Sequence, residues 1–202
     1  ISITDGIEPE PRLAAILARY QDQLGDRFKE VIGRADMFLD GERGHIRNRE
    51  TTLGNFVADI MMSHTGAQMA LINSGAIRAS IRQGPITLED VFKTVPFPNE
   101  LATMQLTGAE IEQALLRSVS RTPADADGGF LQVSGITFDV RGRSVENVRV
   151  GKDRQPLQPK TDYKVAITDF LATGGDSYTV FKGKDHIQTG LPLRELLVDT
   201  IR

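Results

Sequence analysis

Two short segments of the sequence contain arginines that could bind a phosphate group. Arg43 and Arg47 stand four residues apart in GERGHIRNRE, and Arg78 directly follows NSGAI. A guanidinium presents a planar fork of N–H donors that grips a phosphate through two hydrogen bonds, and two arginines together can hold one phosphoryl group. The alternative for Arg43 and Arg47 is a solvated charged loop, which the residues alone favour, and for Arg78 it is an ion-paired surface residue.

A ring and an amide stand close together in VPFPNE. Phe97 lies between Pro96 and Pro98, which stiffen the backbone around the ring, and Asn99 follows. A rigid exposed ring beside an amide is a reasonable platform for a purine, because stacking contributes roughly 1–3 kcal/mol per base and an amide can read the base edge. The ordinary alternative is that Phe97 fills the core.

The segment FLATGGDSY, residues 170–178, combines a ring, a flexible turn and a carboxylate. Phe170 could supply a second stacking face, while Gly174 and Gly175 let the chain turn back tightly. Asp176 could then accept two hydrogen bonds from a ribose diol. Taken alone, TGGD more commonly marks nothing but a tight turn.

The sequence contains no motif for metal binding or for nucleophilic catalysis. The three histidines, His45, His64 and His186, form no H-x-x-x-H or D-x-H pattern. The sequence has no cysteine, no G-x-S-x-G elbow and no G-x-x-x-x-G-K-S/T phosphate loop. We therefore expect no catalytic residue, no metal ligand and no bound cofactor in this chain.

Composition describes an ordinary globular protein. The 202 residues are 40% hydrophobic and 25% charged, enough for one domain or one domain with an extension. The net charge of −3 gives no general basic field, so we expect no polynucleotide partner. No apolar run reaches the roughly 18 residues of a membrane span, and cysteine usage identifies no compartment. Because the chain starts at Ile1, we expect upstream sequence.

Hydrophobic periodicity and capping signals indicate the helices. Apolar residues from Leu13 to Leu24 recur at helical spacing, and a proline suits the first turn. Thr107 and Glu110 have the spacing of a capping box. Helices are expected after Pro9 and Pro11, from Thr51 or Thr52 to Gly66, from Thr87, over about 108–120, and in the tail 191–202.

Strands are expected mainly in the second half. Extended segments are predicted at 31–44, 67–73, 100–106, 135–140, 145–150 and 162–168, with a turn at 84–86 and a polar loop at 122–129. Helices concentrate in the first 120 residues and strands in the next 50, with some alternation early on. This order predicts an α+β domain built on a mixed β-sheet with packed helices.

Six motifs, in order and at matching spacings, resemble the C-terminal domain of the 5′-nucleotidase family, which includes bacterial UDP-sugar hydrolases and animal ecto-5′-nucleotidases. They are GERGHIR, TLGNFVADIM, INSGAIR, VPFPNELATMQLTGAEI, GGFLQVSGITF and DFLATGGDSY, and they cover residues from about 30 to 183. The resemblance favours the binding interpretation of every candidate residue over the surface or core interpretation.

The resemblance implies a nucleotide site and assigns its residues. Phe97 and Phe170 would sandwich the base, Asn99 would hydrogen-bond it, Asp176 would bind the ribose hydroxyls, Arg43, Arg47 and Arg78 would bind the phosphate, and Gly128 would line the pocket. Pro98 departs from the glycine that some members have between ring and amide, which could shift base preference.

The resemblance also implies a second domain that this chain lacks. In the family, an N-terminal metallophosphatase domain carries two divalent metal ions and a catalytic His–Asp dyad. Its D-x-H and G-N-H-D/E motifs are missing here. We expect residues 1–30 to form an interdomain linker and helix, with the hinge region at 9–25, and residues 31–202 to form the substrate-binding domain.

The parent protein is expected to hydrolyse nucleoside 5′-monophosphates. UDP-sugars and 2′,3′-cyclic nucleotides are further candidate substrates. The isolated chain should be inactive, and the family resemblance alone implies a periplasmic or cell-surface location. A stand-alone nucleotide-binding module is the main alternative. A thiosulfohydrolase of sulfur oxidation is another, but Phe97 and Phe170 would serve no purpose there.

Overall fold

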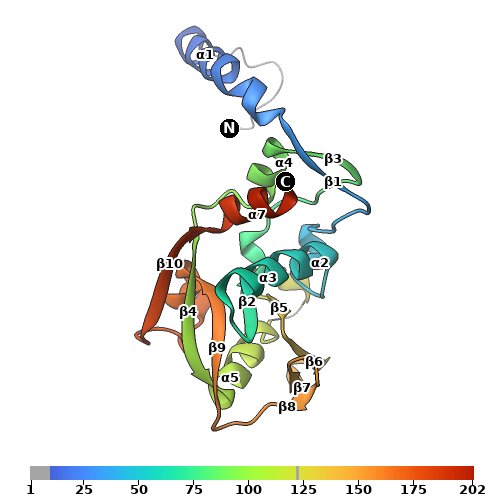
Figure 1. Ribbon diagram of the computed structural model, residues 1–202, viewed down its shortest axis with the longest axis vertical. Coiled ribbons are helices and arrows are strands. Elements are labelled where there is room, and N and C mark those ends of the chain that lie inside the picture. Colours follow the sequence, from blue (N-terminus) through green and yellow to red (C-terminus); the bar gives the residue numbers. More distant parts are fainter. Residues whose placement is uncertain (1–9, 122) are drawn as a thin grey trace.

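The computed structural model describes residues 10–121 and 123–202 and confirms the predicted α+β class, with helices packed on a mixed sheet (Figure 1). The five-stranded sheet has the order β10-β4-β9-β2-β5. Within it β2 and β9 run parallel, and every other neighbouring pair is antiparallel. Its strands are β2 (Met69–Asn73), β4 (Glu100–Thr107), β5 (Leu131–Ser134), β9 (Asp162–Thr168) and β10 (His186–Pro192).

Both faces of the central sheet are covered. Along β2, Ala70 and Ile72 belong to one buried cluster, while Met69 and Leu71 belong to another. Because successive side chains of a strand point to opposite faces, β2 must be apolar throughout, which explains the unbroken hydrophobic run. Helices α3 (Thr52–Thr65), α4 (Leu88–Thr94) and α7 (Leu193–Ile201) supply the first cluster, and α5 (Gly108–Ser118) and α6 (Asp169–Ala172) the second.

Capping signals placed the helix ends correctly. Thr51 accepts a hydrogen bond from the main-chain N–H of Gly54 at the start of α3, and Gly66 ends that helix with φ = 57°. Thr107 and Glu110 form the predicted capping box of α5. Such caps satisfy main-chain groups that the helix itself leaves without partners.

Two smaller sheets flank the central one. Strands β1 (Val31–Ala35) and β3 (Gly84–Thr87) pair with each other, and β6 (Ile136–Arg141), β7 (Ser144–Val150) and β8 (Gln155–Pro156) form a three-stranded sheet. The prediction of a turn at 84–86 was wrong, because these residues pair with β1. Strands β5 and β10 were not predicted.

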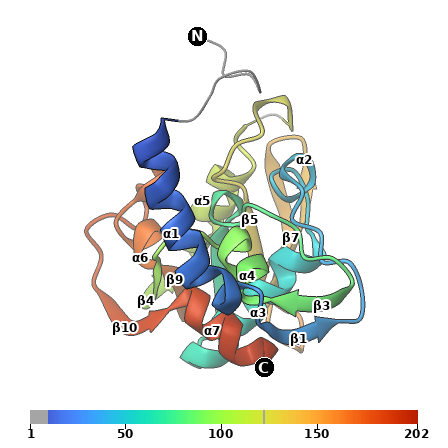
Figure 2. The same ribbon diagram turned by 90° about the horizontal axis from the view of Figure 1, so that it is seen from above.

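The predicted first helix, α1 (Pro11–Phe28), begins with Pro11 in its first turn. It leads away from one end of the molecule, beyond α4 and α7 (Figures 1 and 2). Its apolar residues Leu13 and Leu17 are 59% and 61% exposed, although their spacing suggested a packed face. Phe28 meets the edge of Phe92 on α4, with ring centres 5.0 Å apart. Residues 1–9 of the predicted linker and Thr122 of the predicted loop lie outside the described residues.

Within the described part of the chain, no helix combines the length and apolar character needed to cross a membrane.

Candidate functional site

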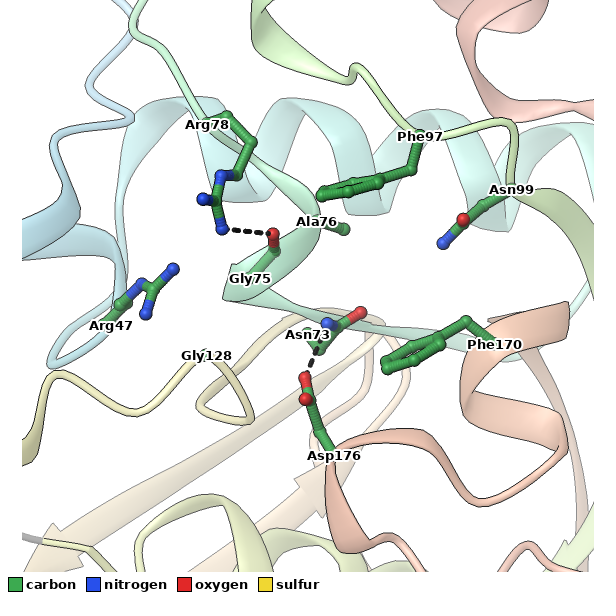
Figure 3. Close-up of a pocket in the computed structure, with 10 residues that line it drawn as sticks. All are labelled: Arg47, Asn73, Gly75, Ala76, Arg78, Phe97, Asn99, Gly128, Phe170 and Asp176. Atoms are coloured by element: carbon green, nitrogen blue, oxygen red, sulfur yellow. Dashed lines mark hydrogen bonds between the residues drawn. The ribbon is translucent and has the colours of Figure 1, made fainter.

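A cavity of about 370 Å³ gathers seven of the eight predicted site residues (Figure 3). They are Arg47, Arg78, Phe97, Asn99, Gly128, Phe170 and Asp176. Three further residues line the same cavity: Asn73, Gly75 and Ala76. The eighth predicted residue, Arg43, does not line it.

The strand directions explain why residues far apart in sequence meet here. Strands β2 and β9 are parallel, so Asn73 at the end of β2 and Phe170 just after β9 lie at one edge of the sheet. Strand β4 runs antiparallel to β9, with Leu101 opposite Thr168, and this brings Asn99 to the same edge. Ligands commonly bind at the carboxyl ends of parallel strands. The cavity therefore lies where β2 and β9 end and β4 begins.

Two aromatic rings stand across the cavity from each other, with the amide of Asn99 beside the space between them (Figure 3). Phe97 and Phe170 are 44% and 40% exposed, so neither ring is buried in the core. The alternative that Phe97 fills the core is therefore excluded. Exposed aromatic faces are costly in water, and a flat apolar ligand between them would remove both from solvent. The arrangement is suited to a planar heterocycle.

The two adjacent glycines of TGGD have separate tasks. Gly174 has φ = 92°, a left-handed conformation that glycine adopts at little cost. A Cβ atom on Gly175 would lie 2.5 Å from ring atoms Cε1 and Cζ of Phe170 and 2.6 Å from its carbonyl oxygen. The ring of Phe170 thus rests against bare backbone, and any side chain at position 175 must displace it.

Replacing Gly175 with alanine is therefore expected to shift Phe170. If the ring stacks on a base, as the family resemblance implies, this shift should weaken the binding of adenosine about 10-fold, within the range that stacking on one base supplies. Isothermal titration of adenosine into the variant measures this. The matched control is Gly25→Ala, since a Cβ on Gly25 meets nothing within 4 Å. Equal affinities for the Gly175 variant and the wild type would show that the position of the Phe170 ring is unimportant.

Asp176 and Asn73 form a polar pair beside the rings. The Nδ2 group of Asn73 donates a hydrogen bond to the Asp176 carboxylate at 2.7 Å. Asn73 is only 4% exposed, and among the described residues its Oδ1 atom has no hydrogen-bond partner. Buried polar atoms are rarely left unpaired, so this oxygen is suited to accept a hydrogen bond from a ligand. Sequence reasoning missed Asn73, although its place at the end of a buried strand was a usable signal.

Arg47 and Arg78 supply positive charge at the other end of the cavity (Figure 3). Arg47 donates to the carbonyl oxygen of Ala126 at 2.7 Å, and the guanidinium carbon of Arg78 lies 5.8 Å from the ring centre of Phe97. Burial lowers the pKa of Arg47 from its ordinary value, and the charges of Arg43 and Arg78 lower it further. Cations that repel one another in this way favour a bound anion.

Arg43 lies in α2 (Arg43–Ile46), a one-turn helix, although the sequence predicted an extended segment as far as residue 44. Its side chain is exposed and outside the cavity lining, yet its charge reaches Arg47. The structure thus leaves Arg43 at the surface while Arg47 lines the cavity, and the phosphate contact expected of Arg43 stays a prediction.

Over residues 10–121 and 123–202, no three histidine, aspartate or glutamate side chains gather into a group that could hold a metal ion. The cavity instead offers rings, amides, one carboxylate and two guanidinium groups, which are binding groups for an organic anion.

Comparison with known proteins identifies several relatives. The family described as 5′-nucleotidase, C-terminal domain, matches residues 31–183. The trifunctional nucleotide phosphoesterase protein YfkN of Bacillus subtilis is 36% identical over 198 residues, covering 92% of this chain and 14% of its own length. A 5′-nucleotidase of Vibrio cholerae is 31% identical over 199 residues, covering 97% of this chain and 35% of its own length.

The fold has a solved counterpart as well. The crystal structure of a 5′-nucleotidase precursor from Thermus thermophilus superposes with a TM-score of 0.83 at 35% sequence identity, covering 96% of this chain and 40% of that one. The chain thus spans less than half the length of each protein compared.

Proposed function

The chain belongs to the 5′-nucleotidase C-terminal domain family, and we propose that it is the domain in which a longer nucleotidase recognises its nucleotide. One observation carries the proposal: the cavity presents two facing rings, a carboxylate and two arginines in the order that base, ribose and phosphate have in a nucleotide (Figure 3). A thiosulfate-type substrate has no planar part to occupy the space between the rings.

Each part of a nucleoside 5′-monophosphate has a matching group. The base stacks between Phe97 and Phe170, and Asn99 hydrogen-bonds its edge. The Asp176 carboxylate accepts hydrogen bonds from the ribose hydroxyls, with the unpaired oxygen of Asn73 as a further acceptor. Arg47 and Arg78 hold the phosphate through charge-assisted hydrogen bonds.

Hydrolysis itself belongs, in this proposal, to an N-terminal metallophosphatase domain of the same polypeptide. The relatives named as 5′-nucleotidases are longer than this chain, and the match covers only 35% and 40% of their length. Two divalent metal ions in that domain would activate the attacking water. The present chain binds and orients the substrate and contributes no group to the metal centre.

The isolated chain should therefore bind AMP without hydrolysing it. When AMP and Mn²⁺ are incubated with the purified 202-residue chain, phosphate release should stay at the level of a buffer blank, while calorimetry detects AMP binding. The Phe170→Ala variant, purified in the same way, controls for a contaminating phosphatase. Phosphate release that scales with wild-type chain and disappears in the variant would refute the division of labour.

Titration with adenosine, AMP and UDP-glucose addresses the substrate class. Stronger binding of AMP than of adenosine is expected from the two arginines, whereas a chain that binds none of the three ligands would overturn the proposal.

A further inference from the structure

Arg117, near the end of α5, does not line the cavity, yet it connects two of its walls. Its Nε and Nη2 groups donate to the main-chain carbonyl oxygen of Asp176 at 3.0 and 2.6 Å. Its Nη1 group donates to the carboxylate of Asp127 at 2.7 Å. The guanidinium carbon also lies 5.2 Å from the ring centre of Tyr178. All three nitrogens of the guanidinium group thus donate hydrogen bonds, and the side chain is only 19% exposed.

The backbone that Arg117 holds is in an uncommon conformation. Asp176 has φ = 49° and ψ = 32°, and Ser177 has φ = 64°, so two successive residues other than glycine are left-handed. Aspartate tolerates this region better than most residues, but such a conformation persists only where surrounding contacts fix it. The two hydrogen bonds from Arg117 to the carbonyl of Asp176 are contacts of that kind, and the Asp176 carboxylate consequently faces Asn73 and the cavity.

Asp127 extends the same arrangement to the opposite wall. Its carboxylate accepts hydrogen bonds from Arg117 and from the main-chain N–H of Gly129, and its neighbour Gly128 lines the cavity. Burial alone would raise the pKa of Asp127, but the hydrogen bonds from Arg117 and Gly129 hold it below its ordinary value. Asp127 is therefore ionised at neutral pH and fixes the guanidinium electrostatically.

Gly129 leaves the space that the guanidinium occupies. A Cβ atom at this position would lie 2.6 Å from Nη2 of Arg117. A methyl group at position 129 would therefore push Arg117 away from Asp176 without changing the chemistry of either residue.

We propose that Arg117 is a positioning residue for ribose recognition: it holds Asp176 in its left-handed conformation so that the carboxylate meets the sugar hydroxyls. The inference rests on the proposed function, in which Asp176 binds the ribose diol. Arg117 itself touches no part of the nucleotide and acts through Asp176.

The variant Arg117→Lys tests the inference. Lysine retains the charge opposite Asp127 but has one nitrogen, which cannot donate twice to the Asp176 carbonyl and also pair with Asp127. The readout is the ratio of affinities for adenosine and 2′,3′-dideoxyadenosine, because the dideoxy compound lacks the hydroxyls that Asp176 would bind. A general loss of structure would weaken both ligands alike, whereas a positioning role predicts selective loss.

The wild-type chain should prefer adenosine about 10-fold or more, as expected for hydrogen bonds to a charged group. In Arg117→Lys, adenosine should bind about 5- to 10-fold more weakly, while the affinity for the dideoxy compound stays within about twofold. Arg141→Lys is the matched control, since Arg141 pairs with Glu146 in the separate three-stranded sheet. It should keep the wild-type ratio.

The outcomes separate the inference from the proposed function. A wild-type chain with no preference for adenosine refutes the ribose role of Asp176 and the inference together. A normal preference in wild type that persists in folded Arg117→Lys refutes the inference alone. If Arg117→Lys does not fold, Gly129→Ala decides: the inference stands if that variant loses the preference and falls if it keeps it.

Discussion

Phe170→Ala should weaken adenosine binding about 5- to 150-fold, the range that corresponds to roughly 1–3 kcal/mol for stacking on one base. Phe170 is 40% exposed and stands across the cavity from Phe97, so its removal leaves one face of the base in water. Because the ring rests on Gly175 rather than in the core, folding should be little affected. Isothermal titration with adenosine measures the loss.

Ribose 5-phosphate provides an internal control, because it lacks a base and should bind Phe170→Ala as it binds the wild type. Phe38→Ala is the matched control variant, since Phe38 is a phenylalanine with similar exposure, 48%, outside the cavity lining. A Phe170 variant with unchanged affinity for adenosine would mean that the rings do not hold a base.

Arg78→Ala is expected to weaken AMP binding about 10- to 150-fold, because a charge-assisted hydrogen bond contributes about 1.5–3 kcal/mol. Adenosine has no phosphate and should lose little affinity. Arg78 is the cleaner choice of the two lining arginines, because its hydrogen bond to the carbonyl oxygen of Gly75 is long, 3.4 Å, whereas Arg47 donates to the carbonyl oxygen of Ala126 at 2.7 Å and its removal would disturb that loop. Titrations of AMP and adenosine into the same variant separate the two contributions.

Arg43→Ala is the informative comparison for Arg78→Ala. Arg43 lies outside the cavity lining, so its effect on AMP should be smaller and should fade with added salt. Equal losses of adenosine and AMP affinity in Arg78→Ala would contradict a phosphate site, and would instead point to the contact between Arg78 and the Phe97 ring.

Local signals in the sequence predicted much of the fold. Helix ends depend on a few neighbouring residues, so Gly66 and Thr107 could be identified as caps directly, and the N-cap of α3 could be narrowed to Thr51 or Thr52. Strand β10 could not, because its burial pattern is mixed and it includes Gly190 and Pro192. It forms by hydrogen bonding to β4, which is a tertiary contact that no local pattern encodes.

The same distinction applies to the cavity. The rings, the carboxylate and the arginines were predictable as residue types, and the family resemblance supplied their roles. Arg117 was not, because it hydrogen-bonds the main chain of Asp176 from 59 residues away in the chain. Asn73, 103 residues from Asp176, had only its place at the end of a buried strand as a local signal. What selects them is geometry at the meeting point of distant segments, and only the folded chain contains it.

The convergence of β2, β4 and β9 has a thermodynamic consequence. The cavity residues come from segments between Arg47 and Asp176 that are far apart in the sequence. A nucleotide bound in the cavity would contact several of these segments at once. A ligand that binds only the folded form adds about 2.7 kcal/mol of stability at 100 times its dissociation constant. A bound nucleotide would then act as a reversible non-covalent link between these segments, and the free energy of unfolding of the domain would rise with nucleotide concentration.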